Sequence, residues 1–206
     1  MATTVPAPPL FAHLGDPWRV AEMLQTPGTV CTGHFRLLSG QHSDQFVRFS
    51  ELARRPEVLG HIVELLAANV APLAPKGVIA PCTAGVALGA EIARRLSVRL
   101  CLASVGEDGR ADGFIDEPPA GGTPMLAVND IVTTGDGLRA LASVVGQADA
   151  TVVGAAAFLC RSEPSAISGL DLPLALVATT PLAAWEPADC RLCAEHEPVA
   201  DGRDLN

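Results

Sequence analysis

The chain is poor in positive charge and in aromatic side chains. Its 206 residues include no tyrosine and a single lysine, Lys76, and the formal net charge is −9. Proteins that bind nucleic acid non-specifically depend on clustered lysine and arginine, and this chain has no such cluster. We therefore expect no nucleic-acid partner. An anionic ligand would have to be held by local hydrogen-bond donors rather than by the overall field of the protein.

Long hydrophobic runs are also missing. No apolar stretch approaches the roughly 20 residues that a membrane-spanning helix needs, so we expect no membrane partner. The N-terminal stretch is broken by prolines and carries no basic segment, which is unlike a secretory signal. We interpret residues 1–12 as a flexible tail.

Cysteine is present, but six residues are too few to make a disulfide scaffold of a chain this long. Several lie inside apolar runs, where a reduced and buried thiol is usual, so we expect a cytoplasmic protein. Cys190 and Cys193 form a Cys-x-x-Cys pair near the C-terminus, with His196 as the nearby candidate for a third zinc ligand. Because structural zinc usually takes four ligands, the pair alone does not establish a metal site.

Hydrophobic residues make up 49% of the sequence, enough for one sizeable core, and we expect residues 1–206 to form a single domain. From residue 56 onward, short apolar strands alternate with helical patterns. This alternation predicts an α/β fold with a mostly parallel sheet flanked by helices. Residues 28–50 predict an N-terminal hairpin, and residues 185–206 a C-terminal tail that carries the cysteine pair. The predicted strands are 29–38, 45–49, 77–80, 99–105, 125–128, 151–160 and 174–178, and the predicted helices begin at residues 17, 56, 86 and 138.

One stretch of the predicted sheet combines polar residues with a turn of small residues. Residues 125–128 are apolar and predict a buried strand, and Asn129 and Asp130 stand where we expect that strand to end. The turn that follows, before a helix, is Thr133, Thr134, Gly135, Asp136 and Gly137. Backbone N–H groups and the positive end of a helix dipole favour phosphate at such a turn. The carboxylate of Asp130 would suit sugar hydroxyls or a bridging magnesium ion.

Several kinds of phosphate loop compete for this turn. The Walker pattern requires a lysine, and none is nearby. Gly135-x-Gly137-x-x-Ala140 matches the loose dinucleotide-binding fingerprint, but residues 129–134 separate the first glycine from the predicted strand, whereas the fingerprint places it at the turn itself. The stretch more closely resembles the phosphoribosyl-diphosphate (PRPP) motif of the type I phosphoribosyltransferases. An ordinary strand-to-helix turn of small residues remains the alternative without function.

A second motif narrows the resemblance. Residues 33–43 read Gly-His-Phe-Arg-Leu-Leu-Ser-Gly-Gln-His-Ser, and the C-terminal region has a tryptophan, Trp185, followed by Cys-x-Leu-Cys. Together with the PRPP motif, these stretches resemble the orotate phosphoribosyltransferases, whose N-terminal hairpin carries a similar signature. The resemblance extends over residues 28–193, nearly the whole chain.

The resemblance implies transfer of a phosphoribosyl group from PRPP to orotate, giving orotidine 5′-monophosphate and diphosphate, with Mg²⁺ and in a homodimer. It implies that Asn129 and Asp130 hold the ribose and that the turn at residues 133–137 holds the 5′-phosphate. By the same resemblance, the base would contact Arg161, Thr133 and Phe35. The diphosphate would be held by Cys82, Thr83, Ala84 and Gly85, and Arg110 would stabilise the leaving group. Asp130 and Arg110 are the expected catalytic residues.

Departures from the family pattern keep two other functions open. Leu38 stands where the family often has lysine, and Asn129 replaces one carboxylate of the acidic pair. Asp136 and Gly137 follow Thr-Thr-Gly where Gly-Ser is usual, and residues 106–113 offer only Arg110 beside three acidic residues. The chain could therefore be a PRPP-binding homologue with weak or lost catalysis, or a phosphoribosyltransferase for another base.

Overall fold

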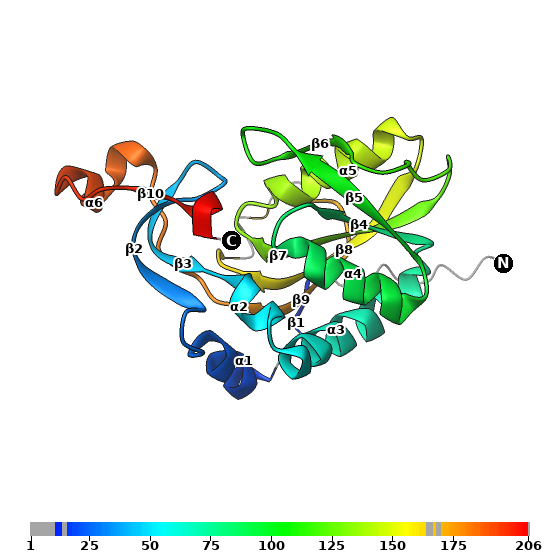
Figure 1. The fold of residues 1–206 in the computed structure, drawn as a ribbon, viewed down its shortest axis with the longest axis horizontal. Helices are drawn as coiled ribbons and strands as arrows, with labels where there is room; N and C mark the ends of the chain where they lie inside the picture. Colours follow the sequence, from blue (N-terminus) through cyan, green and yellow to red (C-terminus); the bar gives the residue numbers. More distant parts are fainter. Residues whose placement is uncertain (1–10, 14–15, 164–166, 168–169, 206) are drawn as a thin grey trace.

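The computed structural model describes residues 11–13, 16–163, 167 and 170–205 (Figure 1). Its main element is a seven-stranded sheet with the order β1-β9-β8-β7-β4-β5-β6. Every neighbouring pair is parallel except β5 and β6, which are antiparallel. The strands are β1 (Phe11–His13), β4 (Gly77–Pro81), β5 (Arg99–Val105), β6 (Ala111–Phe114), β7 (Pro124–Val132), β8 (Thr151–Cys160) and β9 (Leu174–Thr179). The predicted mostly parallel sheet is confirmed.

Helices cover both faces of this sheet (Figure 1). Leu126 and Val128 of β7 point to a cluster shared with α3 and α4, whereas Met125 and Ala127 point to a second cluster shared with α5. This alternation explains why the central strands are apolar without interruption: each residue is buried on one face or the other. The helices are α1 (Pro17–Leu24), α2 (Phe49–Ala53), α3 (Pro56–Val70), α4 (Gly85–Leu96) and α5 (Asp136–Gln147), with a 3-10 turn η1 (Ala71–Leu73) after α3.

A separate three-stranded sheet stands beside the main one. The predicted hairpin forms β2 (Val30–Arg36) and β3 (His42–Val47), which pair antiparallel, and β10 (Ala200–Asp201) adds to β2 in parallel. Figure 1 shows the C-terminal segment, in orange and red, lying against this blue hairpin. The segment is folded rather than a loose tail, with η3 (Pro187–Asp189), α6 (Arg191–Ala194) and η4 (Gly202–Leu205).

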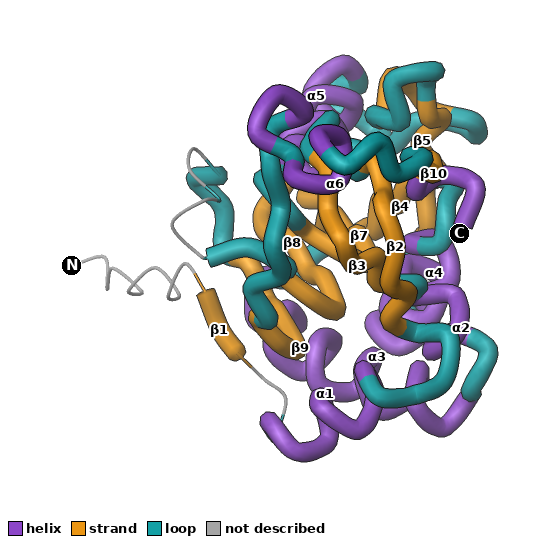
Figure 2. Tube along the Cα trace, turned by 90° about the vertical axis from the view of Figure 1, so that its left-hand side faces the viewer, coloured by secondary structure: helices purple, strands orange, loops and turns teal. Residues whose placement is uncertain are grey.

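Several predicted boundaries were wrong. β7 continues through Asn129 and Asp130 to Val132, because its pairing with β8 goes on to the last residue of both strands. Within the predicted tail, Phe11 and Ala12 belong to β1, which pairs with β9 at the sheet edge (Figure 2). The predicted connection at residues 106–122 contains β6, and the predicted strand at 45–49 ends at Val47, since Phe49 starts α2.

Among the described residues, no helix is long and apolar enough to cross a membrane.

Candidate active site

A cavity of about 690 Å³ opens at the carboxyl ends of β4, β7 and β8. This edge is where open parallel sheets bind ligands. Twelve of the fourteen predicted site residues line the cavity: Cys82, Thr83, Ala84, Arg110, Asn129, Asp130, Thr133, Thr134, Gly135, Asp136, Gly137 and Arg161. The structure therefore brings together residues that lie up to 79 positions apart (82 to 161) in the sequence. The two that do not line it are Gly85 and Phe35.

Asn129 joins the two small-residue loops. Its Oδ1 accepts a hydrogen bond of 2.9 Å from the backbone N–H of Asp130. A Cβ at Gly85, the first residue of α4, would come within 3.2 Å of this Oδ1, and a Cβ at Gly137 would come within 2.9 Å of Nδ2. Both glycines thus leave room for the amide, which is wedged between the amino ends of α4 and α5. Gly85 has a role at the site although it does not line the cavity.

Asp130 is a buried carboxyl group on the cavity wall. Burial raises its pKa above the ordinary value, while hydrogen bonds from the backbone N–H groups of Ile131 and Asp130 oppose that rise. Within the described part of the chain, no ion pair neutralises Asp130. A buried carboxylate without a cationic partner is costly, so its position on the cavity wall favours a role with a ligand.

Hydrogen bonds and an ion pair join the residues of the turn after β7. Gly135 has φ +84°, a left-handed conformation that favours glycine, and Asp136 then begins α5. The Thr134 hydroxyl donates to Asp136 Oδ2 at 2.9 Å, and the Arg139 guanidinium donates to Asp136 and to the Thr134 carbonyl. The hydrogen bond from Arg139 is the main reason that the pKa of Asp136 is lowered.

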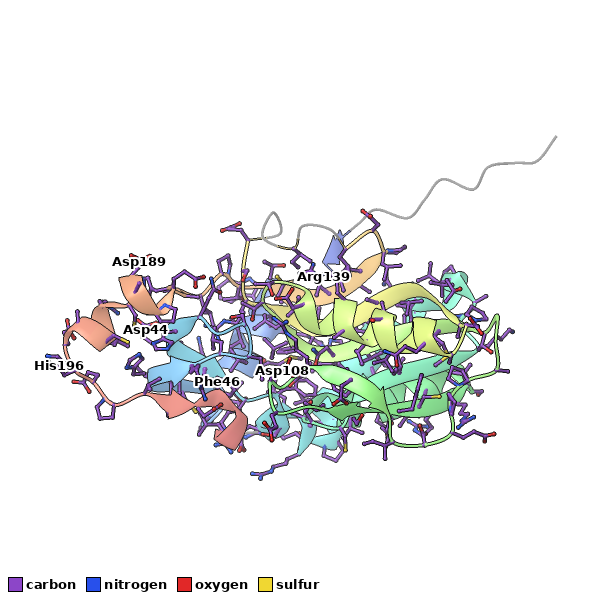
Figure 3. All side chains as sticks on the ribbon, turned by 90° about the horizontal axis from the view of Figure 1, so that it is seen from above. Asp44, Phe46, Asp108, Arg139, Asp189 and His196 are labelled. Carbon is purple, nitrogen blue, oxygen red and sulfur yellow. The ribbon has the colours of Figure 1, made fainter. Side chains whose placement is uncertain are left out.

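Two guanidinium groups therefore face the predicted phosphate turn. Arg110 Nη2 lies 3.6 Å from Asp136 Oδ2, so this loop residue reaches the turn after β7. Sequence reasoning missed Arg139, although its position three residues after Asp136 on a predicted helix could have indicated the pair. Figure 3 shows Arg139 above the main sheet, on the same side of the molecule as the start of α5. These two cations offset the carboxylate that stands at the turn.

Arg161 follows directly on β8 and is 2% exposed. Its Nη2 donates to the Ser43 hydroxyl of the hairpin at 2.7 Å, while its Nε is buried without a hydrogen-bond partner among the described residues. Burial lowers the pKa of Arg161 to about 10, and the more distant Asp44 opposes that change. No described carboxylate forms an ion pair with Arg161; Asp44 instead pairs with Arg191 at 2.6 Å. Arg161 is thus a buried cation on the cavity wall, with no anionic partner in the described part of the chain.

The hairpin supplies one wall of the cavity. Leu37, Leu38 and Ser39, which follow β2, line the cavity, as does Phe46 of β3. Of these, the sequence pointed only to Leu38, as the position where the family often has lysine. Phe35, the predicted contact to the base, lies instead in a small hydrophobic cluster, with its ring centroid 5.8 Å from that of Phe46. Phe35 is buried and does not line the cavity. Figure 3 shows Phe46 on the hairpin side of the molecule, facing the main sheet.

Comparison with known proteins identifies the family. An orotate phosphoribosyltransferase from Pelotomaculum thermopropionicum is 31% identical over 183 residues, which cover 87% of this chain and 93% of that protein. The chain belongs to the orotate phosphoribosyltransferase family. An orotate phosphoribosyltransferase from Chlorobaculum parvum is 30% identical over 86% of this chain and 90% of its own length. No model in the collection of protein families matches the chain.

Solved structures agree with this family on the fold. The crystal structure of orotate phosphoribosyltransferase from Aeropyrum pernix superposes with a TM-score of 0.65 and 26% identity, covering 78% of this chain and 93% of that chain. Adenine phosphoribosyltransferase from Trypanosoma brucei, at 15% identity and a TM-score of 0.61, shares the fold. Family membership excludes the dinucleotide-binding alternative, whereas the spacing does not. Because β7 ends at Val132, only Thr133 and Thr134 separate the strand from Gly135, fewer residues than the sequence suggested.

Proposed function

We propose that the chain transfers the 5-phosphoribosyl group of PRPP to orotate, giving orotidine 5′-monophosphate and diphosphate. The observation that carries the choice of base is Arg161, a buried guanidinium on the cavity wall without an anionic partner among the described residues. A planar guanidinium matches a carboxylate in two parallel hydrogen bonds. Orotate carries a carboxylate, whereas adenine and uracil do not. The names of the relatives point to the same base.

The other cavity residues fit the donor. Backbone N–H groups of the turn at residues 133–137 and the amino end of α5 would hold the 5′-phosphate, and the loop at residues 82–85 before α4 would hold the diphosphate. Asn129 and Asp130 would bind the ribose hydroxyls. When the bond to diphosphate lengthens, positive charge develops at the ribosyl centre, and a nearby carboxylate at Asp130 stabilises that charge. The residues mostly orient the two reactants and neutralise charge.

Magnesium fits this arrangement. Asp130 and Asn129 offer the oxygen ligands that Mg²⁺ prefers, and the ion, when bound with PRPP, would neutralise diphosphate charge. Arg110 would then stabilise the departing diphosphate only after releasing Asp136, its partner at 3.6 Å. This requirement assigns Arg110 two alternative partners, the carboxylate at the turn and the leaving group.

The same proposal includes two expectations about the protein as a whole. We expect a homodimer, because the sites of the family that the chain resembles take a loop from the neighbouring subunit; light scattering on the purified chain would test this. We expect the cytoplasm as the compartment, and the six unpaired cysteines support a reducing environment.

A PRPP-binding homologue with weak catalysis is the second candidate. Asp136 favours it, because a carboxylate beside the phosphate turn repels the phosphate unless both guanidinium groups remain with the carboxylate. Asn129 favours it as well, since an amide adds no charge for magnesium or for a cationic ribosyl centre.

One pair of measurements separates these candidates. Diphosphate release is followed with PRPP, magnesium and either orotate, uracil or adenine, and PRPP binding is measured by calorimetry on the same preparation. Release with orotate alone supports the proposal. PRPP binding without release favours the second candidate, and release with another base refutes the choice of orotate. Asp130→Asn serves as the comparison variant, and we expect it to bind PRPP more weakly and to turn over more slowly.

A further inference from the structure

Four potential metal ligands meet at one point of the small sheet, outside the cavity. His34 comes from β2 and His42 from β3, while Cys190 precedes α6 and Cys193 lies within it. One ligand atom from each lies within 4.8 Å of the other three. Three of the four side chains are buried, and none of them lines the cavity. The proposed transfer reaction uses none of them.

The spacing of these atoms matches a tetrahedral zinc site. His34 Nε2 lies 2.9 Å from His42 Nδ1, 3.4 Å from Cys190 Sγ and 3.7 Å from Cys193 Sγ. His42 Nδ1 lies 3.2 Å from Cys193 Sγ. Around a tetrahedral zinc ion, standard bond lengths place two nitrogens about 3.4 Å apart and a nitrogen and a sulfur about 3.6 Å apart. Each of these four separations differs from the tetrahedral value by about half an ångström or less, and the other two pairs of ligand atoms lie within 4.8 Å.

One histidine is already held in the form that a metal requires. His34 Nδ1 lies 2.8 Å from the backbone carbonyl oxygen of Glu197, which can only accept a hydrogen bond. The proton therefore sits on Nδ1, and the lone pair of Nε2 faces the other three ligands. Metal-binding histidines are usually oriented by such a hydrogen bond from the second ring nitrogen.

The ligand types select the metal. Two thiols and two imidazoles, without a carboxylate, exclude magnesium and calcium, which prefer oxygen, and they suit zinc. Four protein ligands leave no position for a substrate, which is typical of structural rather than catalytic zinc.

We propose that His34, His42, Cys190 and Cys193 bind one structural zinc ion. His196, the third ligand that the sequence suggested, is not part of the cluster; Figure 3 shows it at the outer tip of the C-terminal segment. The missing ligands come from the hairpin, about 150 residues earlier in the chain (190 − 42 = 148), so spacing near the Cys-x-x-Cys pair could not reveal them.

The ion would fasten the C-terminal segment to the hairpin. Other contacts join the same two parts: Arg191 pairs with Asp44 at 2.6 Å, and His42 exchanges backbone hydrogen bonds with Trp185, each 2.8 Å long. Ser43, next to His42, accepts from Arg161 at 2.7 Å and donates to the Ala183 carbonyl. The zinc site therefore supports the cavity wall, because its ligand His42 is the neighbour of Ser43, which accepts the hydrogen bond from Arg161.

Metal content tests the proposal. The untagged full-length chain, produced with zinc in the medium, should contain about one zinc ion per chain by elemental analysis. Cys190→Ser and Cys193→Ser should each lose most of it. Cys31→Ser, a half-buried cysteine of the same hairpin, and His196→Ala should retain the wild-type content. Equal zinc content in all variants, or less than about one ion per ten wild-type chains, would overturn the proposal.

A second measurement covers the case in which the cysteine variants do not fold. Wild-type protein, stripped of metal and reloaded with cobalt(II), should show the intense visible bands of a tetrahedral ion with thiolate ligands. Loss of metal should lower the melting temperature, and equimolar zinc should restore it. An octahedral cobalt spectrum, or a disulfide between Cys190 and Cys193 in freshly isolated protein, would refute the assignment.

Discussion

Replacing Arg161 with methionine should make the free protein more stable and the enzyme much less active. Folding buries this guanidinium without an anionic partner among the described residues, and its lowered pKa reports the cost. A fall of the pKa to about 10 corresponds to a cost of about 3 kcal/mol at roughly 1.4 kcal/mol per pH unit. Since the folded pKa lies below the unfolded one, the penalty applies in full below about pH 10, and hence at neutral pH.

Methionine has a similar length and no charge, so Arg161→Met removes this penalty. It also removes the hydrogen bond to Ser43, worth about 1 kcal/mol. The Ser43 hydroxyl keeps its 2.6 Å bond to the Ala183 carbonyl, so no buried donor is left unpaired. We expect a net gain of about 2 kcal/mol in the free energy of unfolding, or a rise of roughly 4 to 8 °C in melting temperature for a chain of this size.

In the proposed complex, the same change removes both hydrogen bonds from Arg161 to the carboxylate of orotate. Each charge-assisted bond contributes about 1.5 to 3 kcal/mol, so kcat/KM for orotate should fall by roughly a hundredfold to ten-thousandfold. PRPP affinity should change less than about twofold, because this contact belongs to the base. Urea unfolding without ligands and steady-state kinetics measure the two effects. Arg94→Met, on the exposed side of α4, is the matched control, and we expect neither effect from it.

Two results would refute this reasoning. A variant destabilised by more than about 1 kcal/mol would mean that Arg161 is a satisfied structural residue. Unchanged orotate kinetics in a folded variant would mean that another group binds the base.

Three further predictions concern the donor side of the cavity. Asp130→Asn should slow turnover and raise stability at neutral pH. Because burial raises the pKa of Asp130 in the folded protein, the wild type loses stability as pH rises, so the stability difference between variant and wild type should shrink on acidification. A stability difference in urea unfolding that stays constant with pH would exclude this cause. Asp136→Asn should tighten PRPP binding, measured by calorimetry, by roughly threefold to tenfold, because it frees two guanidinium groups at a partly exposed site. The gain in affinity should be smaller in high salt. Weaker binding would show instead that the carboxylate organises the turn. Gly137→Ala should raise KM for PRPP, because the new Cβ would come within 2.9 Å of Asn129 Nδ2. Gly146→Ala on the same helix should leave KM unchanged, because a Cβ there meets nothing within 4 Å. Equal effects of the two variants would argue against a role for Asn129.

The parallel sheet and most helices could be predicted from the sequence, because apolar periodicity reflects burial directly. The end of β7 could not. Asn129 and Asp130 are polar and therefore predict a strand end, yet pairing with β8 keeps Asp130 in the strand and buried at the cavity. A strand that delivers polar groups to a ligand breaks the apolar pattern by which strands are recognised.

The candidate site was predictable where it rests on local motifs, and not where it depends on distant contacts. The two small-residue loops follow from strand-to-helix order, and both line the cavity. Phe46 was missed because nothing local distinguishes it from Phe35, which is buried in the same hydrophobic cluster but does not line the cavity. Ser43 was quoted only as part of a motif; its contact with Arg161 joins residues 118 positions apart.

The hairpin is synthesised well before the segments that it contacts. His42 can pair with Trp185, Ser43 with Ala183, and β2 with β10 only after those later residues have been made. The main sheet is complete once β9 has been made, so it can fold before the hairpin wall of the cavity is fastened. A nascent chain stalled near residue 180 would then present the two small-residue loops of the cavity with the hairpin wall still unfastened.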